Sequence, residues 1–347
     1  MKQIRSWLGT ALDRTRVLEA ARAARRRGLP VGGGLTVLLY HRVADPAEVG
    51  ELDPSMIDAT PAEFDAQMAY VRQHFAPVSI DDVLEARRAG RALPPDSVLV
   101  SFDDGYRDNF ENAAPILQRH GMKGLFFITT GHVRHRRLFW WEQVSLIVRR
   151  CRLPRARIAY PRAEVLDLST PEDQAQVVRR LNKIIKERYA LDLDRFLAGV
   201  ADACEVRWDD AEARALADRA LMSWEDVRTL RQQGMGIGSH TDSHRVLLTL
   251  PPAPLAAELA DSRAALEELL GEPVTTIAYP VGRAVTQVVP VREAVAAARY
   301  ELGFTTRPGV NRFTPADDPF DLLRLSVDRG LPDGLLRTYF TFPRLAA

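Results

Sequence analysis

A recurring unit constrains the fold of this chain more than any other feature. A short apolar run is followed by polar or glycine residues and then by a helical pattern; the runs cover residues 35–40, 98–102, 124–128, 235–238, 274–279 and 322–327. The runs are continuously apolar rather than alternating, which favours strands covered on both faces, as in a parallel sheet. The repeated strand–helix order predicts an α/β fold with a barrel or a doubly wound sheet.

Helices are predicted between these runs, and some have readable ends. Residues 110–120 show a helical pattern, and Ser223 with Glu225 and Asp226 forms a capping-box pattern that opens a helix over 224–233. A long amphipathic helix over 255–270 is closed by Gly271. Residues 132–222 contain little strand signal, and we interpret them as a mostly helical insertion between two strands.

The two ends of the chain are expected to lie outside the main domain. Residues 1–34 are rich in arginine and predict a basic amphipathic helix; its apolar side comprises Ile4, Trp7, Leu8, Ala11 and Leu12. This helix either packs on the domain or lies on anionic lipid as a peripheral membrane contact. No secretory signal pattern is present, so we expect a cytoplasmic protein, with membrane association as the alternative. Residues 332–347 are interpreted as a C-terminal tail.

Composition excludes several classes of protein. The formal net charge of the 347 residues is +1, and no nucleic-acid recognition motif is present, so we expect no nucleic-acid partner. No run approaches the roughly 18 apolar residues of a membrane span. The 2 cysteines, Cys151 and Cys204, are too few for a disulfide framework or a cysteine-only zinc cluster, and we interpret them as core thiols. The arginines of 134–157 form either a solvated face or a surface for an anionic ligand.

Chemically reactive residues cluster where the apolar runs stop. His41 follows the first run, Asp103 and Asp104 follow the second, and His240 and His244 follow the fourth. In parallel α/β folds, the carboxyl ends of the strands form the rim of the active site. These residues are therefore expected to converge on one pocket.

The combination of two histidines and a carboxylate points to a metal site. Two imidazoles four residues apart can face one point, and with one carboxylate they make the three protein ligands of an open catalytic zinc site. A second, adjacent carboxylate then remains free to act as a base. The sequence thus predicts a hydrolase site that holds a divalent metal ion, with Zn²⁺ as the expected metal.

These motifs resemble those of the polysaccharide deacetylase family, the NodB homology domain of carbohydrate esterases. The resemblance is carried by residues 101–105 (SFDDG) and 240–244 (HTDSH), with further matches at 39–43, 279–282, 304–306 and 324–328. It implies a distorted (β/α) barrel of about seven parallel strands over residues 35–331. It also implies metal-dependent removal of acetyl groups from an N-acetylated saccharide, as in the branch that acts on poly-N-acetylglucosamine.

The resemblance also implies a role for each site residue. Asp104, His240 and His244 match the metal ligands and Asp103 matches the catalytic base. The backbone N–H of Val281 matches the oxyanion position, and His41 resembles the general acid, which we expect to titrate near its ordinary pKa of about 6.5.

Two departures from the family pattern affect the proposed roles. Ala278 stands where many relatives carry an arginine that pairs with the catalytic aspartate, and residues 325–327 lack the histidine that supplies the acid elsewhere. Arg324 is a candidate for the place of the missing arginine; the alternative is an ordinary salt bridge.

Two other functions remain open on the sequence. The same metal site could hydrolyse a non-sugar amide or a cyclic imide, or the protein could be a non-catalytic carbohydrate-binding protein. Aromatic residues near the motifs are candidates for stacking on sugar rings, with core packing as the alternative: Tyr40, Trp140, Trp141 and Tyr279.

Overall fold

The structure is a computed structural model, and it describes residues 17–26, 34–207, 209–282, 285, 287–312, 317–342 and 345. The apolar residues predicted for the N-terminal helix, Ile4 to Leu12, lie outside these residues. Within them, α2 (Val17–Arg26) is helical, and Leu18 on it is buried. None of the helices in the described ranges has the length and apolar character needed to cross a bilayer.

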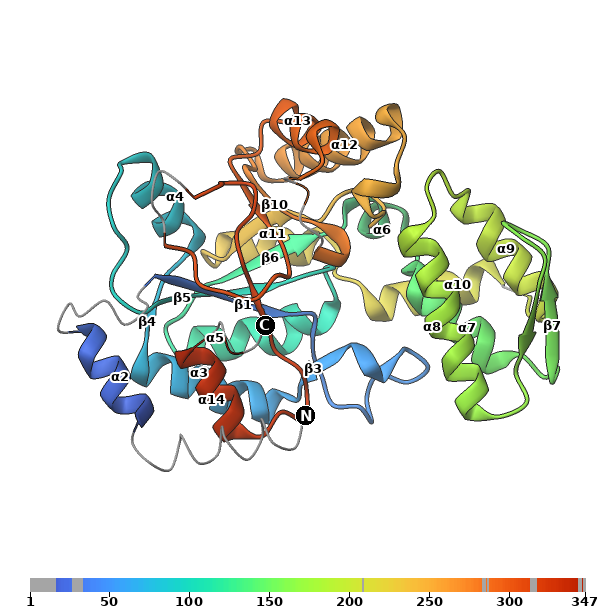
Figure 1. Cartoon of the computed structure of the whole chain (residues 1–347), viewed down its shortest axis with the longest axis horizontal. Coiled ribbons are helices and arrows are strands. Elements are labelled where there is room, and N and C mark those ends of the chain that lie inside the picture. Colours follow the sequence, from blue (N-terminus) through green and yellow to red (C-terminus); the bar gives the residue numbers. More distant parts are fainter. Residues whose placement is uncertain are drawn as a thin grey trace.

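A parallel sheet forms the centre of the molecule (Figure 1). In the described part of the chain it has eight strands, seven of them in the order β11-β10-β9-β6-β5-β1-β12, with β4 also paired to β5. The strands are β1 (Leu35–Tyr40), β4 (Ala76–Pro77), β5 (Ser97–Phe102), β6 (Gly124–Ile128), β9 (Gly236–Ser239), β10 (Thr276–Ala278), β11 (Leu302–Phe304) and β12 (Leu325–Ser326). The curved sheet with helices around it confirms the prediction of an α/β fold of the distorted (β/α) barrel type.

Burial explains why the strand runs are continuously apolar. Every residue of β1, β5 and β6 is buried, because side chains on both faces of each strand are covered. Two small pairs of strands lie outside the main sheet: β2 (Arg42–Val43) with β3 (Ile57–Ala59), and the antiparallel β7 (Arg155–Ile158) with β8 (Glu164–Asp167).

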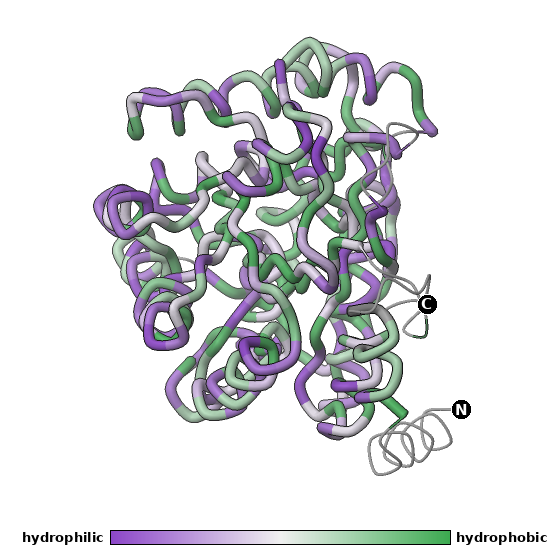
Figure 2. Tube along the Cα trace, turned by 90° about the vertical axis from the view of Figure 1, so that its left-hand side faces the viewer, coloured by the Kyte–Doolittle hydropathy of each residue, from purple (hydrophilic) through white to green (hydrophobic). Residues whose placement is uncertain are grey.

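Helices lie around the sheet and in the segment over 132–222. They are α3 (Pro61–His74), α4 (Ile80–Arg88), α5 (Ala114–Arg119), α6 (Thr130–His135), α7 (Trp140–Arg150), α8 (Pro171–Glu187), α9 (Leu193–Ala203), α10 (Asp210–Ala220), α11 (Trp224–Gln232), α12 (Pro252–Leu270), α13 (Val289–Ala297) and α14 (Asp333–Thr341). Shorter turns are η1 (Pro54–Met56), η2 (Asn109–Ala113), η3 (Leu247–Thr249) and η4 (Pro280–Gly282). Figure 2 shows that hydrophobic residues gather in the interior and that hydrophilic residues are frequent on the outward-facing turns.

The predicted helix ends have a clear physical basis. Ser223 caps α11 through a capping box with Asp226, and Gly271 ends α12 in the left-handed conformation at φ 70°. The predicted helix over 110–120 is divided between η2, a π-helical turn, and α5. The segment predicted as a C-terminal tail includes α14, whose Leu336 and Phe340 pack into the core beneath the sheet.

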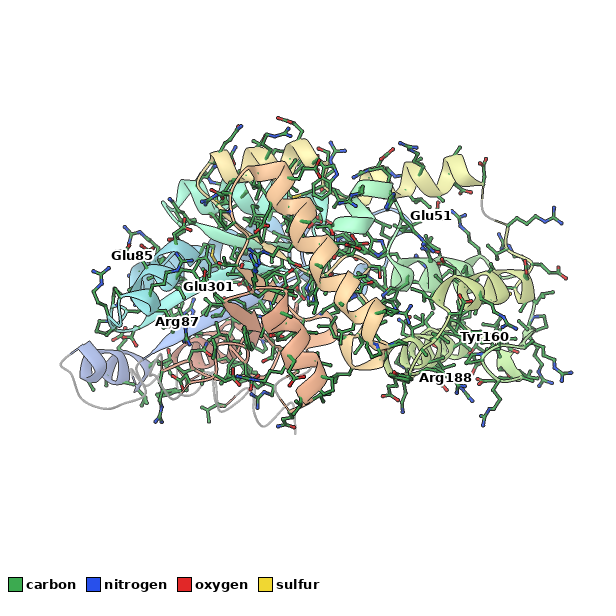
Figure 3. All side chains as sticks on the ribbon, turned by 90° about the horizontal axis from the view of Figure 1, so that it is seen from above. Glu51, Glu85, Arg87, Tyr160, Arg188 and Glu301 are labelled. Carbon is green, nitrogen blue, oxygen red and sulfur yellow. The ribbon has the colours of Figure 1, made fainter. Side chains whose placement is uncertain are left out.

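The segment over 132–222 contains most of α6, then α7 to α10 and the β7–β8 ribbon, and it extends to one side of the sheet (Figure 1). It has its own apolar core, built from α7 to α10 and the β7–β8 ribbon together with residues 44–57 and Tyr106. Seen from above, Glu51, Tyr160 and Arg188 lie at this end of the molecule, and Glu85, Arg87 and Glu301 lie at the other (Figure 3). The helical insertion therefore shares a core with the loop that follows β2 and with the residues after β5.

Candidate metal centre

The parallel sheet brings the reactive residues to one edge. Asp103 and Asp104 directly follow β5, His240 directly follows β9, and His41 directly follows β1. Since β5, β6 and β9 are neighbours and run parallel, their carboxyl ends lie at the same edge. Asp104, His240 and His244 come together there, and all three side chains are buried.

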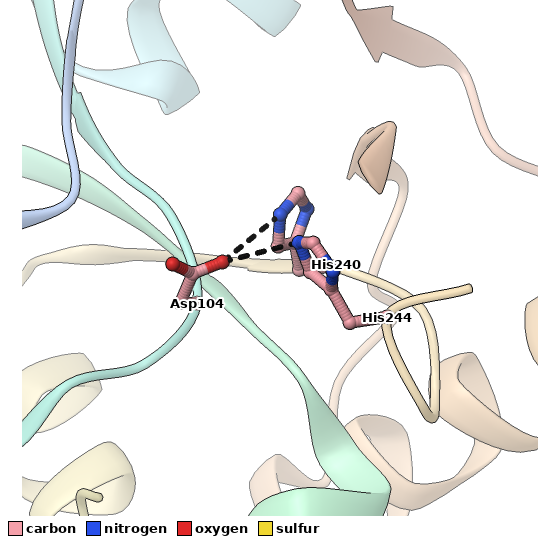
Figure 4. A group of neighbouring side chains, drawn as sticks. All are labelled: Asp104, His240 and His244. Carbon is pink, nitrogen blue, oxygen red and sulfur yellow. Dashed lines mark ion pairs between the residues drawn. The ribbon is translucent and has the colours of Figure 1, made fainter. Parts of the chain in front are cut away.

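Figure 4 shows Asp104 facing both imidazoles. Its Oδ1 lies 3.4 Å from Nε2 of His240 and 3.3 Å from Nε2 of His244. One ligand atom from each of the three side chains lies within 4.8 Å of the others. Asp104 Oδ1 is buried and has no hydrogen-bond partner among the described residues. An oxygen and two nitrogens that converge on one point in this way fit a divalent metal ion.

The protonation states of these groups suit metal binding. Burial alone would raise the pKa of Asp104, but the nearby imidazoles outweigh burial and lower it strongly. Burial, together with the neighbouring His240, lowers the pKa of His244 to about 4. At neutral pH the aspartate is therefore ionised and the imidazole of His244 is neutral, which are the forms that bind metals.

The two histidines are oriented by different means. Nδ1 of His240 lies 2.8 Å from the carbonyl oxygen of Ala278, so Nδ1–H donates there and Nε2 presents its lone pair to the site. Nδ1 of His244 has no hydrogen-bond partner among the described residues. The His244 ring instead lies against Trp141, with 4.5 Å between ring centroids, and Trp140 Nε1 donates to the His244 carbonyl oxygen at 3.2 Å.

Asp103 lies beside the three grouped residues and pairs with Arg324. Nη1 and Nη2 of Arg324 donate to the two oxygens of Asp103 at 2.6 and 2.7 Å, and Nε donates to the carbonyl oxygen of Thr305 at 2.9 Å. Burial would raise the pKa of Asp103, but the charge of Arg324 and the nearby His240 outweigh burial and lower it. Asp103 is consequently ionised at neutral pH.

His41 pairs with an aspartate that sequence reasoning missed. Its Nδ1 lies 3.1 Å from Oδ2 of Asp58 on β3, and its backbone N–H donates to the same oxygen. Burial would lower the pKa of His41, but Asp58, with smaller contributions from the charges of Asp104 and Asp103, outweighs burial and raises the pKa to about 9, well above the expected 6.5. The side chain of His41 keeps 30% exposure, so a proton on it can reach a substrate. In the sequence, Asp58 stands out only as an acidic residue between two apolar residues, Ile57 and Ala59.

Val281 lies in the turn η4, three residues after Ala278, whose carbonyl holds His240. Its φ is 62°, a left-handed conformation that valine rarely adopts. The turn is closed by a bond from the Gly282 N–H to the Tyr279 carbonyl at 2.7 Å, and a Cβ on Gly282 would collide with Thr306 at 2.0 Å. The strained turn thus fixes the direction of the Val281 backbone, in the segment that follows the Ala278 carbonyl bound by His240.

The four aromatic candidates for sugar stacking are all buried: Tyr40, Trp140, Trp141 and Tyr279. Core packing is therefore their role. Sequence reasoning missed the polar network behind Trp141, where Nε1 donates to Tyr106 Oη at 2.8 Å and Tyr106 donates to Glu142 at 3.0 Å. Burial raises the pKa of Glu142 to about 7.

Comparison with known proteins identifies a family. The family described as polysaccharide deacetylase matches residues 90–189 and 203–302, which together are more than half of the chain. The match runs through much of the helical insertion as well as through both motifs that carry the candidate ligands.

Individual relatives are distant. One relative is YxkH of Bacillus subtilis (strain 168), whose name assigns it provisionally to the polysaccharide deacetylases. It is 21% identical over 284 residues, which make up 79% of this chain and 65% of YxkH. A poly-β-1,6-N-acetyl-D-glucosamine N-deacetylase of Escherichia coli (strain K12) is 34% identical over 86 residues, 24% of this chain and 12% of that protein. This chain thus covers less than two thirds of the length of both relatives.

A solved structure shares the fold. The Streptococcus pyogenes deacetylase PplD in complex with acetate superposes with a TM-score of 0.55 at 20% sequence identity, over 88% of this chain and 97% of PplD. At this level of identity the likeness concerns the fold alone.

Proposed function

We propose, because this chain belongs to the polysaccharide deacetylase family, that it hydrolyses the acetamide of an N-acetylhexosamine-containing saccharide and releases acetate. One observation carries the proposal: a buried Asp104–His240–His244 group with a second ionised carboxylate, Asp103, beside it. The E. coli relative that acts on poly-β-1,6-N-acetyl-D-glucosamine supports this substrate class.

Asp104, His240 and His244 would hold the metal ion, and their two nitrogens and one oxygen fit Zn²⁺. A bound divalent ion would supply Lewis acidity, which lowers the pKa of a water to about 7 and polarises a carbonyl group. The protein keeps these ligands buried, with His240 held by Ala278 and His244 held by Trp141, so that little reorganisation is needed on binding.

Asp103 is proposed as the general base that takes a proton from the attacking water. Its Oδ2 lies 3.8 Å from Nε2 of His240, beside the ligand group and not among it. The two hydrogen bonds from Arg324 keep the carboxylate ionised and fix its orientation. A site that only bound a metal would not need this second, separately held carboxylate, which argues against a non-catalytic protein.

The leaving nitrogen needs a proton, because an amine leaves far more readily than its anion. His41 is proposed to donate it, since the neighbouring carboxylates, Asp58 above all, keep the imidazole protonated up to a pH of about 9. The backbone N–H of Val281, in the strained turn η4, is proposed to donate to the developing oxyanion. A preorganised donor of this kind contributes about 2.7–4 kcal/mol to transition-state stabilisation.

Mass spectrometry of candidate substrates tests the proposal. The purified, metal-loaded protein is incubated with N-acetylglucosamine oligomers, and we expect products that have lost acetyl groups together with an equal amount of acetate. A protein with Asp103→Asn serves as the control. Oligomers that bind without losing acetyl groups would favour a carbohydrate-binding protein. Cleavage of cyclic imides or non-sugar amides alone would favour a hydrolase that acts on those compounds instead of on sugars.

A further inference from the structure

The loop between the two candidate histidine ligands is short and conformationally strained. Thr241 and His244 have φ values of 64° and 55°, in the left-handed region that residues other than glycine rarely adopt. Such conformations persist where the surroundings hold them in place. Contacts that hold residues 241–243 therefore determine where the His244 imidazole lies relative to that of His240.

Helix α12 holds this loop through Glu258. Oε2 of Glu258 accepts hydrogen bonds from the backbone N–H groups of Asp242 at 3.0 Å and Ser243 at 2.8 Å, and Oε1 accepts from the Ser243 hydroxyl. One turn further along α12, the Ser262 hydroxyl pairs with that of Ser239 at 2.8 Å. Residues four apart lie on the same face of a helix. Glu258 and Ser262 therefore bind residues that precede and follow His240 in the sequence.

Helix α6 holds the opposite side of the same loop. Thr130 Oγ1 donates to Asp242 Oδ1 at 2.8 Å, and the N–H of Gly131 donates to the Asp242 carbonyl oxygen at 2.8 Å. A Cβ on Gly131 would lie 2.6 Å from Asp242 Oδ2, so the two segments are packed as closely as their backbones allow. The loop is thus fixed between two helices.

We propose that Glu258 is a positioning residue of the metal site, which sets the spacing of the His240 and His244 imidazoles by fixing the loop between them. The inference rests on the proposed function, since it takes these histidines as metal ligands. Glu258 accepts hydrogen bonds from three donors of the loop, and none of these three donors belongs to an imidazole. Without it, two backbone N–H groups lose their acceptor and the strained loop can relax, which moves His244 away from Asp104.

Substitutions at Glu258 separate positioning from general stability. Glu258→Ala removes all three bonds. Glu258→Gln keeps an oxygen for the two backbone N–H groups, and its amide can donate to the Ser243 hydroxyl, which then accepts. Glu268→Ala on the same helix is the matched control, because Glu268 is exposed. The readout is the Kd for Zn²⁺, measured by competition with a chromophoric chelator, and the visible spectrum of the Co²⁺-loaded protein.

We expect Glu258→Ala to weaken Zn²⁺ binding by about 10–100-fold, the usual effect of losing a residue that orients a metal ligand. The Co²⁺ spectrum should change in this variant, whereas Glu258→Gln should restore binding to within a few-fold of wild type. Glu268→Ala should bind as wild type does. If Glu258→Ala does not fold, Ser243→Ala removes one of the three donors and should weaken binding by a smaller factor.

The outcomes distinguish this inference from the proposed function. A wild-type protein that binds no divalent ion would overturn the metal site itself. A wild-type protein that binds one ion, with equal affinity in the Glu258→Ala or the Ser243→Ala variant, would overturn the role of Glu258 alone. Equal losses in Glu258→Ala and Glu258→Gln would also overturn it, because Gln preserves the attachment of the loop.

Discussion

Arg324 holds both carboxylate oxygens of Asp103 by parallel hydrogen bonds of 2.6 and 2.7 Å, although 221 residues separate the two in sequence. The guanidinium is fully buried, and its Cζ lies 5.6 Å from the centre of the Phe127 ring. Arg324 precedes β12, two strands away from β5 in the sheet, so the pair joins the last strand of the sheet to the reactive edge. A bidentate pair of this kind fixes the orientation of a carboxylate as well as its charge.

Removal of Arg324 should change the pH dependence of catalysis. Arg324 lowers the pKa of Asp103, and a base must be unprotonated to act. In Arg324→Gln the pKa of Asp103 rises, so activity should be lost at a higher pH on the acid side, and Arg324→Lys should show a smaller shift. The measurement is kcat/KM against pH for acetate release.

Arg88→Gln is the matched control, because Arg88 makes a similar bidentate pair with Glu301 at the exposed surface. An acid limb that stays in place in Arg324→Gln would show that Arg324 does not tune Asp103. Loss of one partner of a buried pair also costs about 3–5 kcal/mol of stability, so the folded state of the variant is checked by thermal unfolding.

Asp103→Asn should separate catalysis from metal binding. The amide keeps the shape of the side chain but cannot take a proton, so kcat should fall by ~10²–10⁴, the usual contribution of general acid–base catalysis. Bound metal, measured by elemental analysis, should remain as in wild type because Asp103 lies outside the group of three candidate ligands. Turnover close to wild type in this variant would remove Asp103 from the mechanism.

His41 should control the alkaline limb of the pH profile. Its pKa is raised to about 9, and a general acid must carry its proton, so activity should fall as the pH rises through about 9. Asp58 raises that pKa, and Asp58→Asn should therefore move the alkaline limb to lower pH. The measurement is again kcat/KM against pH, with a sugar acetamide as substrate.

The leaving group gives an independent check of His41. His41→Ala should slow hydrolysis of the sugar acetamide strongly and that of an activated aryl acetate far less, since an aryl oxide leaves without a proton. If both substrates were slowed equally while the metal content stayed unchanged, His41 would have another role.

The network behind Trp141 should contribute to stability. Tyr106→Phe removes the hydroxyl that accepts from Trp141 and donates to Glu142, and it leaves both groups buried without that partner. An unpaired buried polar group costs about 1–3 kcal/mol, which urea unfolding would detect. Tyr189→Phe at an exposed position is the control and should leave the unfolding midpoint unchanged. Equal midpoints in the two variants would contradict the stabilising role of the network.

The parts of this structure that depend on local sequence were predictable. β1, β5 and β6 are continuously apolar, and Ser223 and Gly271 mark helix ends through their own backbone geometry. The ribbon β7–β8 and the strand β11 escaped prediction because each is short and mixes apolar with polar or glycine residues. Their structure depends on pairing partners that local patterns do not reveal.

The candidate site shows the same division. The two motifs with Asp103, Asp104, His240 and His244 could be found because each ends a strand run. Asp58 and Glu258 could not, because each is an ordinary acid in its own segment and acquires its contact only through tertiary packing. The raised pKa of His41 depends mainly on Asp58, so it could not be predicted either.

The central claim is that Asp104, His240 and His244 bind one divalent ion that deacetylation requires. The most direct test is a titration of the metal-free protein with Zn²⁺ while acetate release from an N-acetylglucosamine oligomer is recorded. We predict that release is absent without metal and rises to a break at a single ion per chain, and that His240→Ala shows no such rise. Full acetate release from the metal-free protein, or the same titration curve in His240→Ala, would contradict the claim.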